Sequence, residues 1–158
     1  MPLKLTLQHL NLIRQHGSRD YPSECCGILL GRSNGTDKEI TEVVSLRNLR
    51  HDPAQAQEVL PLESPGAESE RNRFLIDPRD QVRVEKDARA RNLEVVGYYH
   101  SHPDHPARPS TYDRDHAWPC YSYVIISIEQ GKAAEFNSWV LADDRSGFRL
   151  EPVEIVNP

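Results

Sequence analysis

Apolar residues along the chain switch between helical and strand-like spacing, which predicts a sheet with helices packed on it. Residues 5–16 carry apolar side chains at helical spacing, and Gly17 after them is a typical helix end. Residues 24–31 form a short apolar run bounded by glycines, typical of a strand buried on both faces, and its first carboxylate is expected near solvent. A turn signal at 33–35 and weak alternation over 40–46 predict the partner strand of a hairpin.

The second half of the chain continues the same alternation of helices and strands. A short strand is expected at 74–76, and Asp77 and Pro78 begin a helix to about Asn92, with Asp77 as N-cap and proline at the first helical position. Residues 93–99 are the strongest strand. The remaining predicted elements are a helix at 110–117 and strands at 121–128, 134–142 and 148–155. This order predicts an α/β (α+β) domain with a mixed sheet flanked by helices.

Residues 48–72 differ in composition from the rest of the chain. They are rich in Pro, Ala, Gln, Glu, Ser and Gly, with Val59, Leu60 and Leu62 as apolar anchors. We predict a long loop here. Loops of this length are functional lids, binding loops or disordered insertions, and the pattern does not choose among them.

Composition limits the classes of protein to which the chain can belong. Its 158 residues suit a single domain, 1–158, that buries a core without disulfides or a structural metal. A net charge of -5 without a basic stripe argues against nucleic-acid binding and against a membrane surface. No signal sequence or membrane span is expected, and the three cysteines lack a disulfide pattern, so we expect a cytoplasmic protein.

Two histidines at the end of the strongest strand suggest a metal site. His100 and His102 are two residues apart, so an extended backbone places both imidazoles on one face, where a single cation can bind both. The C-terminal ends of strands in α/β sheets commonly border a ligand crevice. Alone, a His-x-His pair is often only polar surface.

A third ligand is expected ten residues further along the chain. Ser110 and Asp113 are spaced so that both side chains lie over the first turn of a helix, which makes Asp113 a candidate ligand with Ser110 beside it. Pro103, Pro106 and Pro109 stiffen the connection and lower the entropy cost of bringing the ligands together.

The combined pattern predicts a catalytic zinc ion. Its five fixed residues are expected to coincide by chance roughly once in 10⁷ starting positions; they are His100, His102, Pro103, Ser110 and Asp113. Two neutral imidazoles and one carboxylate leave zinc with a net positive charge and an open fourth position, which holds a water whose pKa falls to about 7. Harder cations require more oxygen ligands than this stretch supplies.

The base that would accept a proton from such a water cannot be selected by spacing among 24 acidic residues. Asp104, Asp115 and Glu24 are candidates, and each could equally be a solvated surface charge. Glu24 differs because it begins a buried strand, where burial could tune it for proton transfer. Ser110 could serve only as a helix N-cap or could donate a hydrogen bond to a developing oxyanion.

Other histidines and the cysteines are weaker candidates for the site. We expect His105 at the rim, and His116 beside the site or on the plain surface rather than as a fourth ligand. Cys25, Cys26 and Cys120 are expected to be small core residues. A cysteine nucleophile with His116 as base is the weaker alternative, because no cysteine is marked as exposed and electropositive.

These residues resemble a known motif. The stretch Glu24-Cys-Cys-Gly-Ile-Leu-Leu-Gly31, followed by His100-Ser-His-Pro, Ser110 and Asp113, resembles the JAMM motif of MPN-domain zinc metallopeptidases. The resemblance extends over most of the chain, especially to compact bacterial members. It includes the segments Phe74-x-Ile76-Asp77-Pro78, Val96-Gly97-Tyr98-Tyr99 and the strand at 123–127.

The resemblance implies roles for five residues. His100, His102 and Asp113 would bind one Zn²⁺ per chain, Glu24 would be the general acid and base, and Ser110 would stabilise the oxyanion. It also implies a partly barrel-like sheet in the layered fold that MPN domains share with cytidine deaminases. All five motif residues are present, which disfavours a catalytically inactive member.

The family implies a substrate class. Its members cut peptide or isopeptide bonds after the C-terminal glycines of ubiquitin or ubiquitin-like proteins, and short bacterial members are similar to a peptidase that releases cysteine from a sulfur-carrier protein. The partner would be such a small carrier protein. The 48–72 stretch is longer than in a minimal member.

Two alternatives remain from other functional classes. A zinc deaminase fits poorly, because Pro119-Cys120 is followed by Tyr121, Ser122 and Tyr123 rather than by a second cysteine at the required spacing. The other is a non-catalytic module that binds a carrier protein and uses zinc only for stability.

Overall fold

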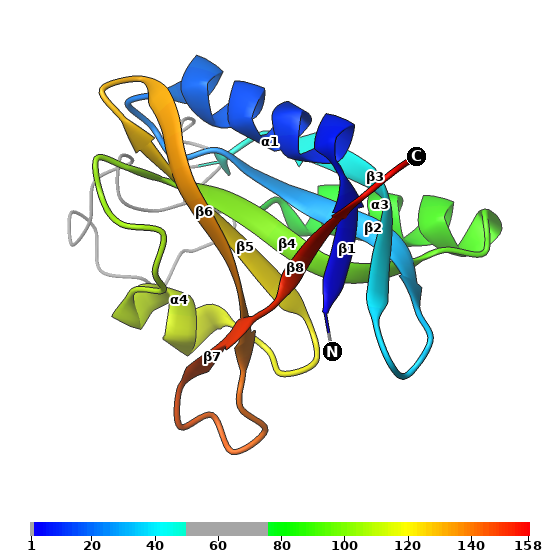
Figure 1. Ribbon diagram of the computed structural model, residues 1–158. Coiled ribbons are helices and arrows are strands. Elements are labelled where there is room, and N and C mark those ends of the chain that lie inside the picture. The colour runs from blue at the N-terminus through cyan, green and yellow to red at the C-terminus, as the bar shows by residue number, and fades with distance from the viewer. Residues whose placement is uncertain (1, 50–75) are drawn as a thin grey trace.

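A computed structural model describes residues 2–49 and 76–158 (Figure 1). Most of the predicted strand at 74–76 and of the predicted loop at 48–72 lies outside these residues. The elements in chain order are β1 (Leu3–Thr6), α1 (Leu7–Asp20), β2 (Cys26–Ser33), β3 (Lys38–Leu46), α3 (Pro78–Ala90), β4 (Glu94–Pro103), α4 (Thr111–His116), β5 (Ser122–Glu129), β6 (Lys132–Leu141), β7 (Phe148–Glu151) and β8 (Val153–Val156).

The strands of the described chain form one mixed sheet, in the order β7-β6-β5-β4-β2-β3-β1-β8. β4 pairs in parallel with β5 and antiparallel with β2, and β1 pairs in parallel with both β3 and β8. β7 and β8 stand at opposite ends of this order although only Pro152 separates them in the chain. The chain therefore passes directly from one edge of the sheet to the other, which curls the sheet into a nearly closed barrel and confirms the predicted fold class.

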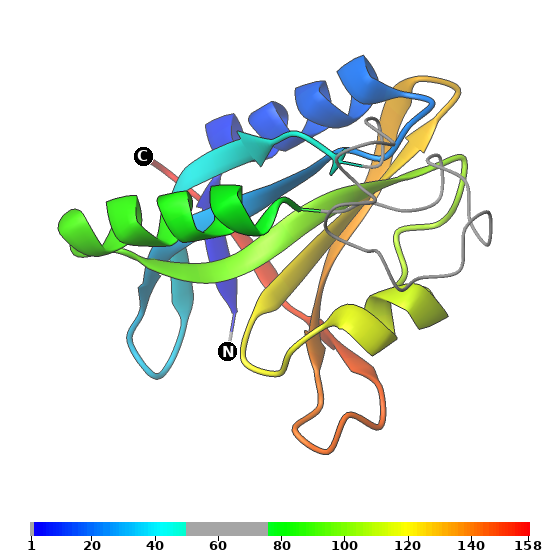
Figure 2. The same ribbon diagram turned by 180° about the vertical axis from the view of Figure 1, so that it is seen from behind.

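Two apolar cores lie on opposite faces of the sheet. On one face α1 contributes Leu10 and Ile13 to a core that includes Tyr99 of β4. On the other face α3 contributes Val84 and Ala88 to a core that includes Cys26 of β2. Figures 1 and 2 show these helices on either side of the strands. Helices on both faces leave the end of β4 as the position where polar side chains can gather.

The first helix differs from its prediction at both ends. It begins at Leu7 because Thr6 caps it, with the threonine hydroxyl accepting a hydrogen bond from His9 N at 3.1 Å, and the residues before it form β1. Gly17 does not end the helix, which continues to Asp20. A Cβ atom on Gly17 would contact the side chain of Ile128, so the glycine lets α1 approach the sheet closely.

Other element boundaries agree with the pattern except near the C-terminus. Asp77 caps α3 and Pro78 is its first residue, as predicted, although the helix ends at Ala90 rather than near Asn92. The single strand predicted at 148–155 is divided at Pro152 into β7 and β8. No helix in the described ranges combines the length and apolar character needed to cross a membrane.

Candidate metal centre

His100 and His102 lie together on one face of β4, as the spacing predicts. β4 remains extended through Pro103, so the two imidazoles leave the strand on the same side. Their Nε2 atoms are 3.2 Å apart, and the two rings are tilted at 58° with centroids 5.0 Å apart. His100 is buried and His102 is partly exposed, which places the pair where the sheet meets solvent.

Asp113 reaches both histidines from the first turn of α4. Ser110 is the N-cap of this helix: its Oγ accepts a hydrogen bond from Asp113 N at 3.1 Å, and its own N–H donates to Asp113 Oδ2 at 2.8 Å. This capping box fixes the carboxylate, whose Oδ1 lies 3.2 Å from His100 Nε2 and whose Oδ2 lies 3.3 Å from His102 Nε2. The structure thus brings His100, His102 and Asp113 into contact, as their spacing in the sequence predicts.

The geometry of this triangle fits a tetrahedral divalent cation. Zinc–nitrogen bonds of about 2.0–2.1 Å at tetrahedral angles separate neighbouring ligand atoms by about 3.3 Å. The two Nε2 atoms are 3.2 Å apart, and each lies at a similar distance from a different oxygen of the Asp113 carboxylate, 3.2 Å for His100 with Oδ1 and 3.3 Å for His102 with Oδ2. In addition, His102 Nδ1 lies 2.9 Å from the carbonyl oxygen of Pro106. A carbonyl only accepts, so Nδ1 carries a proton, and Nε2 is the nitrogen that would bind a metal once its own proton has left.

The electrostatics keep Asp113 ionised. Burial by itself raises the pKa of this carboxyl group, but attraction and hydrogen bonds from His100, together with those from His102, outweigh burial and hold the pKa well below its usual range. The carboxylate therefore contributes a negative charge opposite two imidazoles, a donor set suited to Zn²⁺.

Strand pairing brings Glu24 to this site from 76 positions earlier in the chain. Cys26 of β2 is opposite His100, and the next pair is joined twice: Ser101 N donates to Cys25 O at 3.2 Å, and Cys25 N donates to Ser101 Oγ at 2.8 Å. Extending this register by one residue places Glu24 beside His102. Glu24, His100 and His102 each offer a ligand atom within 4.8 Å of the other two.

Glu24 is buried, contrary to the expectation that this carboxylate lies near solvent at the sheet edge. Its exposed fraction is 2%. The strand it precedes is central, between β3 and β4, and buried Asn48 donates a hydrogen bond from Nδ2 to the Glu24 carbonyl at 3.0 Å. This hydrogen bond ties the main chain at Glu24 to the chain after β3.

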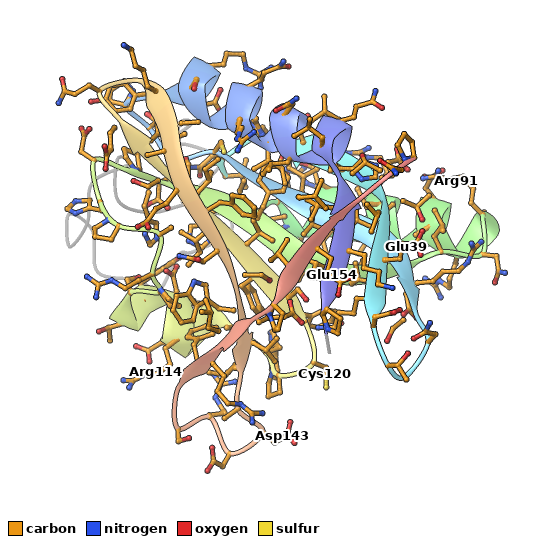
Figure 3. All side chains as sticks on the ribbon, viewed as in Figure 1. Glu39, Arg91, Arg114, Cys120, Asp143 and Glu154 are labelled. Atoms are coloured by element: carbon orange, nitrogen blue, oxygen red, sulfur yellow. The ribbon has the colours of Figure 1, made fainter. Side chains whose placement is uncertain are left out.

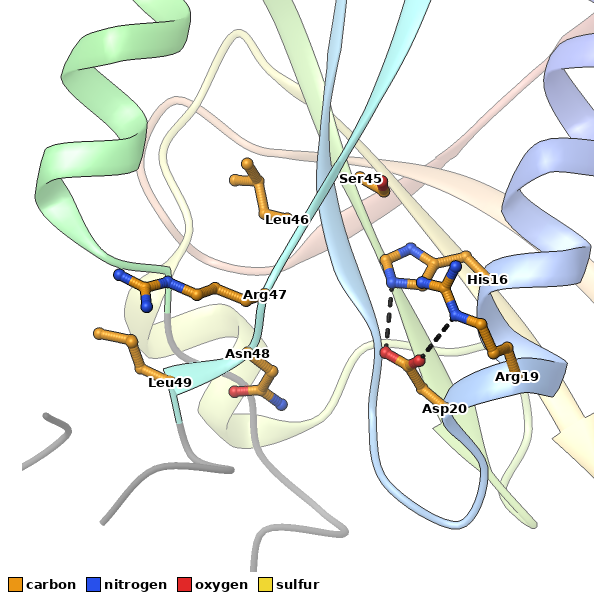
Figure 4. A pocket seen from close by; sticks show the side chains of 8 residues that line it. All are labelled: His16, Arg19, Asp20, Ser45, Leu46, Arg47, Asn48 and Leu49. Atoms are coloured by element: carbon orange, nitrogen blue, oxygen red, sulfur yellow. Dashed lines mark hydrogen bonds and ion pairs between the residues drawn. The ribbon is translucent and has the colours of Figure 1, made fainter. Parts of the chain in front are cut away.

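Asn48 also lines a pocket of about 460 Å³ (Figure 4). It lies between the end of α1, with His16, Arg19 and Asp20, and the chain at 45–49. In the described chain its lining includes neither the two histidines of β4 nor Asp113. The pocket is therefore distinct from the candidate metal centre.

The other candidate bases point elsewhere. Asp104 accepts hydrogen bonds from Tyr21 Oη at 2.6 Å and from Gln130 N at 2.8 Å, so it fastens the loop after β4 to two neighbouring turns. Asp115 is exposed on α4, 3.9 Å from Arg114. Of the three acids that the sequence offered, Glu24 is the one that forms a possible cation-binding group with His100 and His102 in the described chain.

The two other histidines considered for the site, His105 and His116, are surface residues. His116 is exposed, stacks on Tyr112 with ring centroids 4.0 Å apart, and its Nδ1 lies 2.9 Å from the Tyr112 carbonyl, which matches the plain-surface expectation. His105 is exposed as expected at the rim, and its carbonyl accepts a hydrogen bond from Ser127.

The cysteines divide into two kinds. Cys25 and Cys26 are buried, as predicted, whereas Cys120 is exposed, which corrects its expected place in the core. Burial raises the pKa of Cys25 to about 12 and that of Cys26 well above its usual value. Both groups stay protonated thiols at neutral pH, so the structure argues against either as a nucleophile.

Sequence reasoning missed three contributors to the site: Ser101, Asn48 and the carbonyl of Pro106. Ser101 faces the core opposite the histidines, and no local pattern marks a serine that pairs with a distant strand. Asn48 carries no sequence signal, because its partner is a main-chain carbonyl. For Pro106, the sequence indicates only that it is one of the prolines that stiffen the connection between the histidines and Ser110.

Comparisons with known proteins identify the family of the chain. Residues 6–142 match the family model described as prokaryotic homologs of the JAB domain. The chain is 30% identical to a desampylase from Haloferax volcanii, over 75% of this chain and 72% of the relative. It is 28% identical to the CysO-cysteine peptidase of Mycobacterium tuberculosis, over 93% and 86%.

A solved structure agrees with the fold. The solution structure of protein DSY2949 from Desulfitobacterium hafniense superposes with a TM-score of 0.76 at 31% identity, covering 99% of this chain and 94% of that one. With a family model that spans most of its length, the chain belongs to the prokaryotic homologs of the JAB domain.

Proposed function

We propose that this protein is a zinc-dependent peptidase that hydrolyses the peptide or isopeptide bond after the C-terminal Gly-Gly tail of a small ubiquitin-like or sulfur-carrier protein. The observation that carries the proposal is the ligand triangle of His100, His102 and Asp113 with the buried Glu24 beside it. Three ligands and an adjacent buried carboxylate are what a hydrolytic metal site needs, whereas a purely structural zinc site uses a fourth protein ligand.

Each residue has a part that follows from its position. His100, His102 and Asp113 hold the cation, and the hydrogen bond from His102 to the Pro106 carbonyl keeps the correct nitrogen facing it. When bound, zinc would polarise the scissile carbonyl and make a water acidic enough to lose a proton at neutral pH. Glu24 accepts that proton and returns it to the departing amine, and its burial excludes competing water.

Ser110 has two compatible parts. Its oxygen caps α4 by accepting from Asp113 N, and a hydroxyl that accepts one hydrogen bond still has a proton to donate. We assign that proton to the substrate oxygen on which negative charge develops. The capping bond holds the hydroxyl in place before substrate arrives, so the donor is preorganised.

The substrate class rests on the relatives. One relative is named a desampylase, another is named a CysO-cysteine peptidase, and a third, from Thermus thermophilus and 28% identical over 76% of this chain, is named a probable TtuB-protein conjugate cleaving protease. All three names describe cleavage of a bond to a protein partner. We therefore infer a small carrier protein as substrate.

The test is cleavage of a ubiquitin-like carrier joined through its C-terminal glycine to cysteine or lysine, followed by mass spectrometry. We expect cleavage by the zinc-loaded protein and a loss of at least about a hundredfold in kcat for Glu24→Gln, with zinc still bound. Glu39→Gln is the matched control, since Glu39 lies exposed on β3 (Figure 3). Full activity of Glu24→Gln, or no zinc in the purified protein, would overturn the proposal.

A further inference from the structure

The helix that carries the third ligand has little of its own to hold it in place. α4 is six residues long and buries none of them. Helices this short are marginal in water, and in proteins they depend on packing against the core. Yet the first turn of α4 holds Asp113, whose carboxylate must stay within about an ångström of one position to complete the metal site. Contacts at the ends of α4 therefore matter for its position.

At its N-terminal end the helix is joined to the site itself. Ser110 caps the helix, and Asp113 contacts the two imidazoles at 3.2 and 3.3 Å. These contacts are made with the candidate ligands themselves, so they do not anchor the helix to a part of the chain outside the site.

At its C-terminal end the helix is held by one arginine from a distant part of the chain. Arg145, in the turn between β6 and β7, donates from Nη1 to the Ala117 carbonyl at 2.8 Å and from Nη2 to the Arg114 carbonyl at 3.2 Å. Its guanidinium carbon also lies 5.9 Å from the ring centroid of Trp118. Figures 1 and 2 both place the β6–β7 turn next to α4.

This contact suits the end of a helix in both charge and shape. The last carbonyls of a helix lack partners and carry partial negative charge, so a cation that donates to two of them stabilises the last turn. The planar guanidinium reaches both oxygens at once. The turn is itself braced, since Arg145 N donates to Ala142 O at 2.8 Å and Ala142 N donates to Gly147 O at 2.9 Å.

We infer that Arg145 is a positioning residue for the metal centre, which holds α4 against the barrel so that Asp113 meets His100 and His102. The inference rests on the proposed zinc site. The side chain of Arg145 donates hydrogen bonds to the main chain of Arg114 and Ala117, so it acts on Asp113 through the helix backbone. Without it the last turn of α4 frays, Asp113 occupies its position for less of the time, and the cation is bound more weakly.

The test compares Arg145→Ala with the unaltered protein in three measurements. Competition with a chromophoric chelator should show zinc affinity weakened roughly three- to tenfold. Hydrogen exchange should be faster for the amides of 111–117 but unchanged for β2 and β4. Cleavage should show a lower kcat with KM unchanged at subsaturating zinc, and excess zinc should restore kcat.

Two further variants make the result specific. Arg145→Lys keeps the positive charge but loses the planar guanidinium that donates to two carbonyls at once. Its zinc affinity should therefore lie between those of Arg145→Ala and the unaltered protein. Arg149→Ala removes an exposed arginine from the neighbouring strand β7 and should change neither zinc affinity nor exchange in α4. If Arg145→Ala fails to fold, Arg145→Lys provides the same three measurements.

The outcomes separate this inference from the proposed function. Equal zinc affinity and equal exchange of α4 in the unaltered protein and both Arg145 variants would overturn the inference alone. Faster exchange throughout β2 and β4 would also overturn it, because that result indicates a general structural role. Failure of the unaltered protein to bind zinc would overturn the inference and the proposed function together.

Discussion

Ser101 and Cys25 are joined by two hydrogen bonds across β4 and β2, one between main-chain atoms at 3.2 Å and one from Cys25 N to Ser101 Oγ at 2.8 Å. Both residues are fully buried, and Ser101 lies between the two metal-site histidines in sequence but faces the opposite side of the strand. The pair therefore fixes the register that places Glu24 beside His102 without touching the metal centre.

Replacing Ser101 with alanine should damage the site indirectly. The buried N–H of Cys25 would lose its side-chain acceptor, which should lower the free energy of unfolding by about 1–3 kcal/mol. Because Glu24 precedes Cys25, kcat should fall while zinc affinity changes little. Urea unfolding and cleavage kinetics check this. Ser45→Ala, an exposed serine on β3, is the control, and equal stability of the two variants would contradict the prediction.

A buried ion pair should make a large contribution at the other end of the barrel. Lys38 Nζ lies 3.3 Å from Glu151 Oε2 and donates to Ser122 Oγ at 2.8 Å, and both charged residues are buried. Lys38→Met would leave Glu151 buried without its cation, so the free energy of unfolding should fall by about 3–5 kcal/mol. Urea unfolding measures the loss.

The double variant tests the origin of that loss. Lys38→Met with Glu151→Leu removes both charges, so it should be more stable than Lys38→Met alone, although the hydroxyls of Ser122 and Ser138 would then lack the acceptor they share. If the second substitution destabilised the protein further, an unpaired buried charge would not be the cause.

The grouping of the candidate ligands was predictable because their pattern is local. His100 and His102 share a face of any extended strand, and Ser110 and Asp113 share the first turn of any helix that begins there. Glu24 was different. Its place depends on β2 pairing with β4 in one register, and such a pairing between segments 76 positions apart leaves no local periodicity, so residue-level reasoning kept Asp104 and Asp115 open and only the family resemblance selected Glu24.

The errors in the fold have the same origin. Gly17 resembles a helix end because glycine usually weakens helices, but here the sheet comes so close to α1 that a larger residue would strike Ile128. The sequence pattern does not separate the short strand β1 from the following helix, because four residues are too few to show the alternation of apolar and polar side chains that identifies a strand. Pro152 divides the last strand because the chain changes edges there, which only barrel closure explains.

The pH dependence of stability should show the charge on Asp77. Hydrogen bonds from the Arg79 side chain, and from its main chain, together with attraction to Arg79 and Arg47, lower the pKa of this N-cap from 3.8 to about 2. A lowered pKa in the folded state stabilises the protein above the unfolded pKa, and this stabilisation is lost as the pH falls through the folded pKa.

Asp77→Asn isolates this effect because asparagine also caps helices well. The difference in free energy of unfolding between the parent and Asp77→Asn should be constant at neutral pH, and should shrink as the pH falls from about 4 towards 2, the range between the two pKa values. Urea unfolding at a series of pH values measures it. A difference that does not change with pH would show that the arginines do not stabilise the ionised carboxylate.

Removal of zinc should abolish activity but leave the fold intact. The two apolar cores lie on opposite faces of the sheet and contain none of His100, His102 and Asp113, so the barrel does not depend on the metal for its burial. We expect a chelator to stop cleavage and to leave the far-ultraviolet circular dichroism unchanged. The melting temperature should fall only by the amount that corresponds to the lost binding free energy of zinc.

Two histidine variants and one alternative function complete this test. His102→Ala should behave like the chelated protein, whereas His116→Ala should bind zinc normally because His116 faces Tyr112. A module that binds a carrier and uses zinc only for stability would instead lose its cooperative unfolding transition when the metal is removed, since structural zinc contributes directly to the free energy of folding.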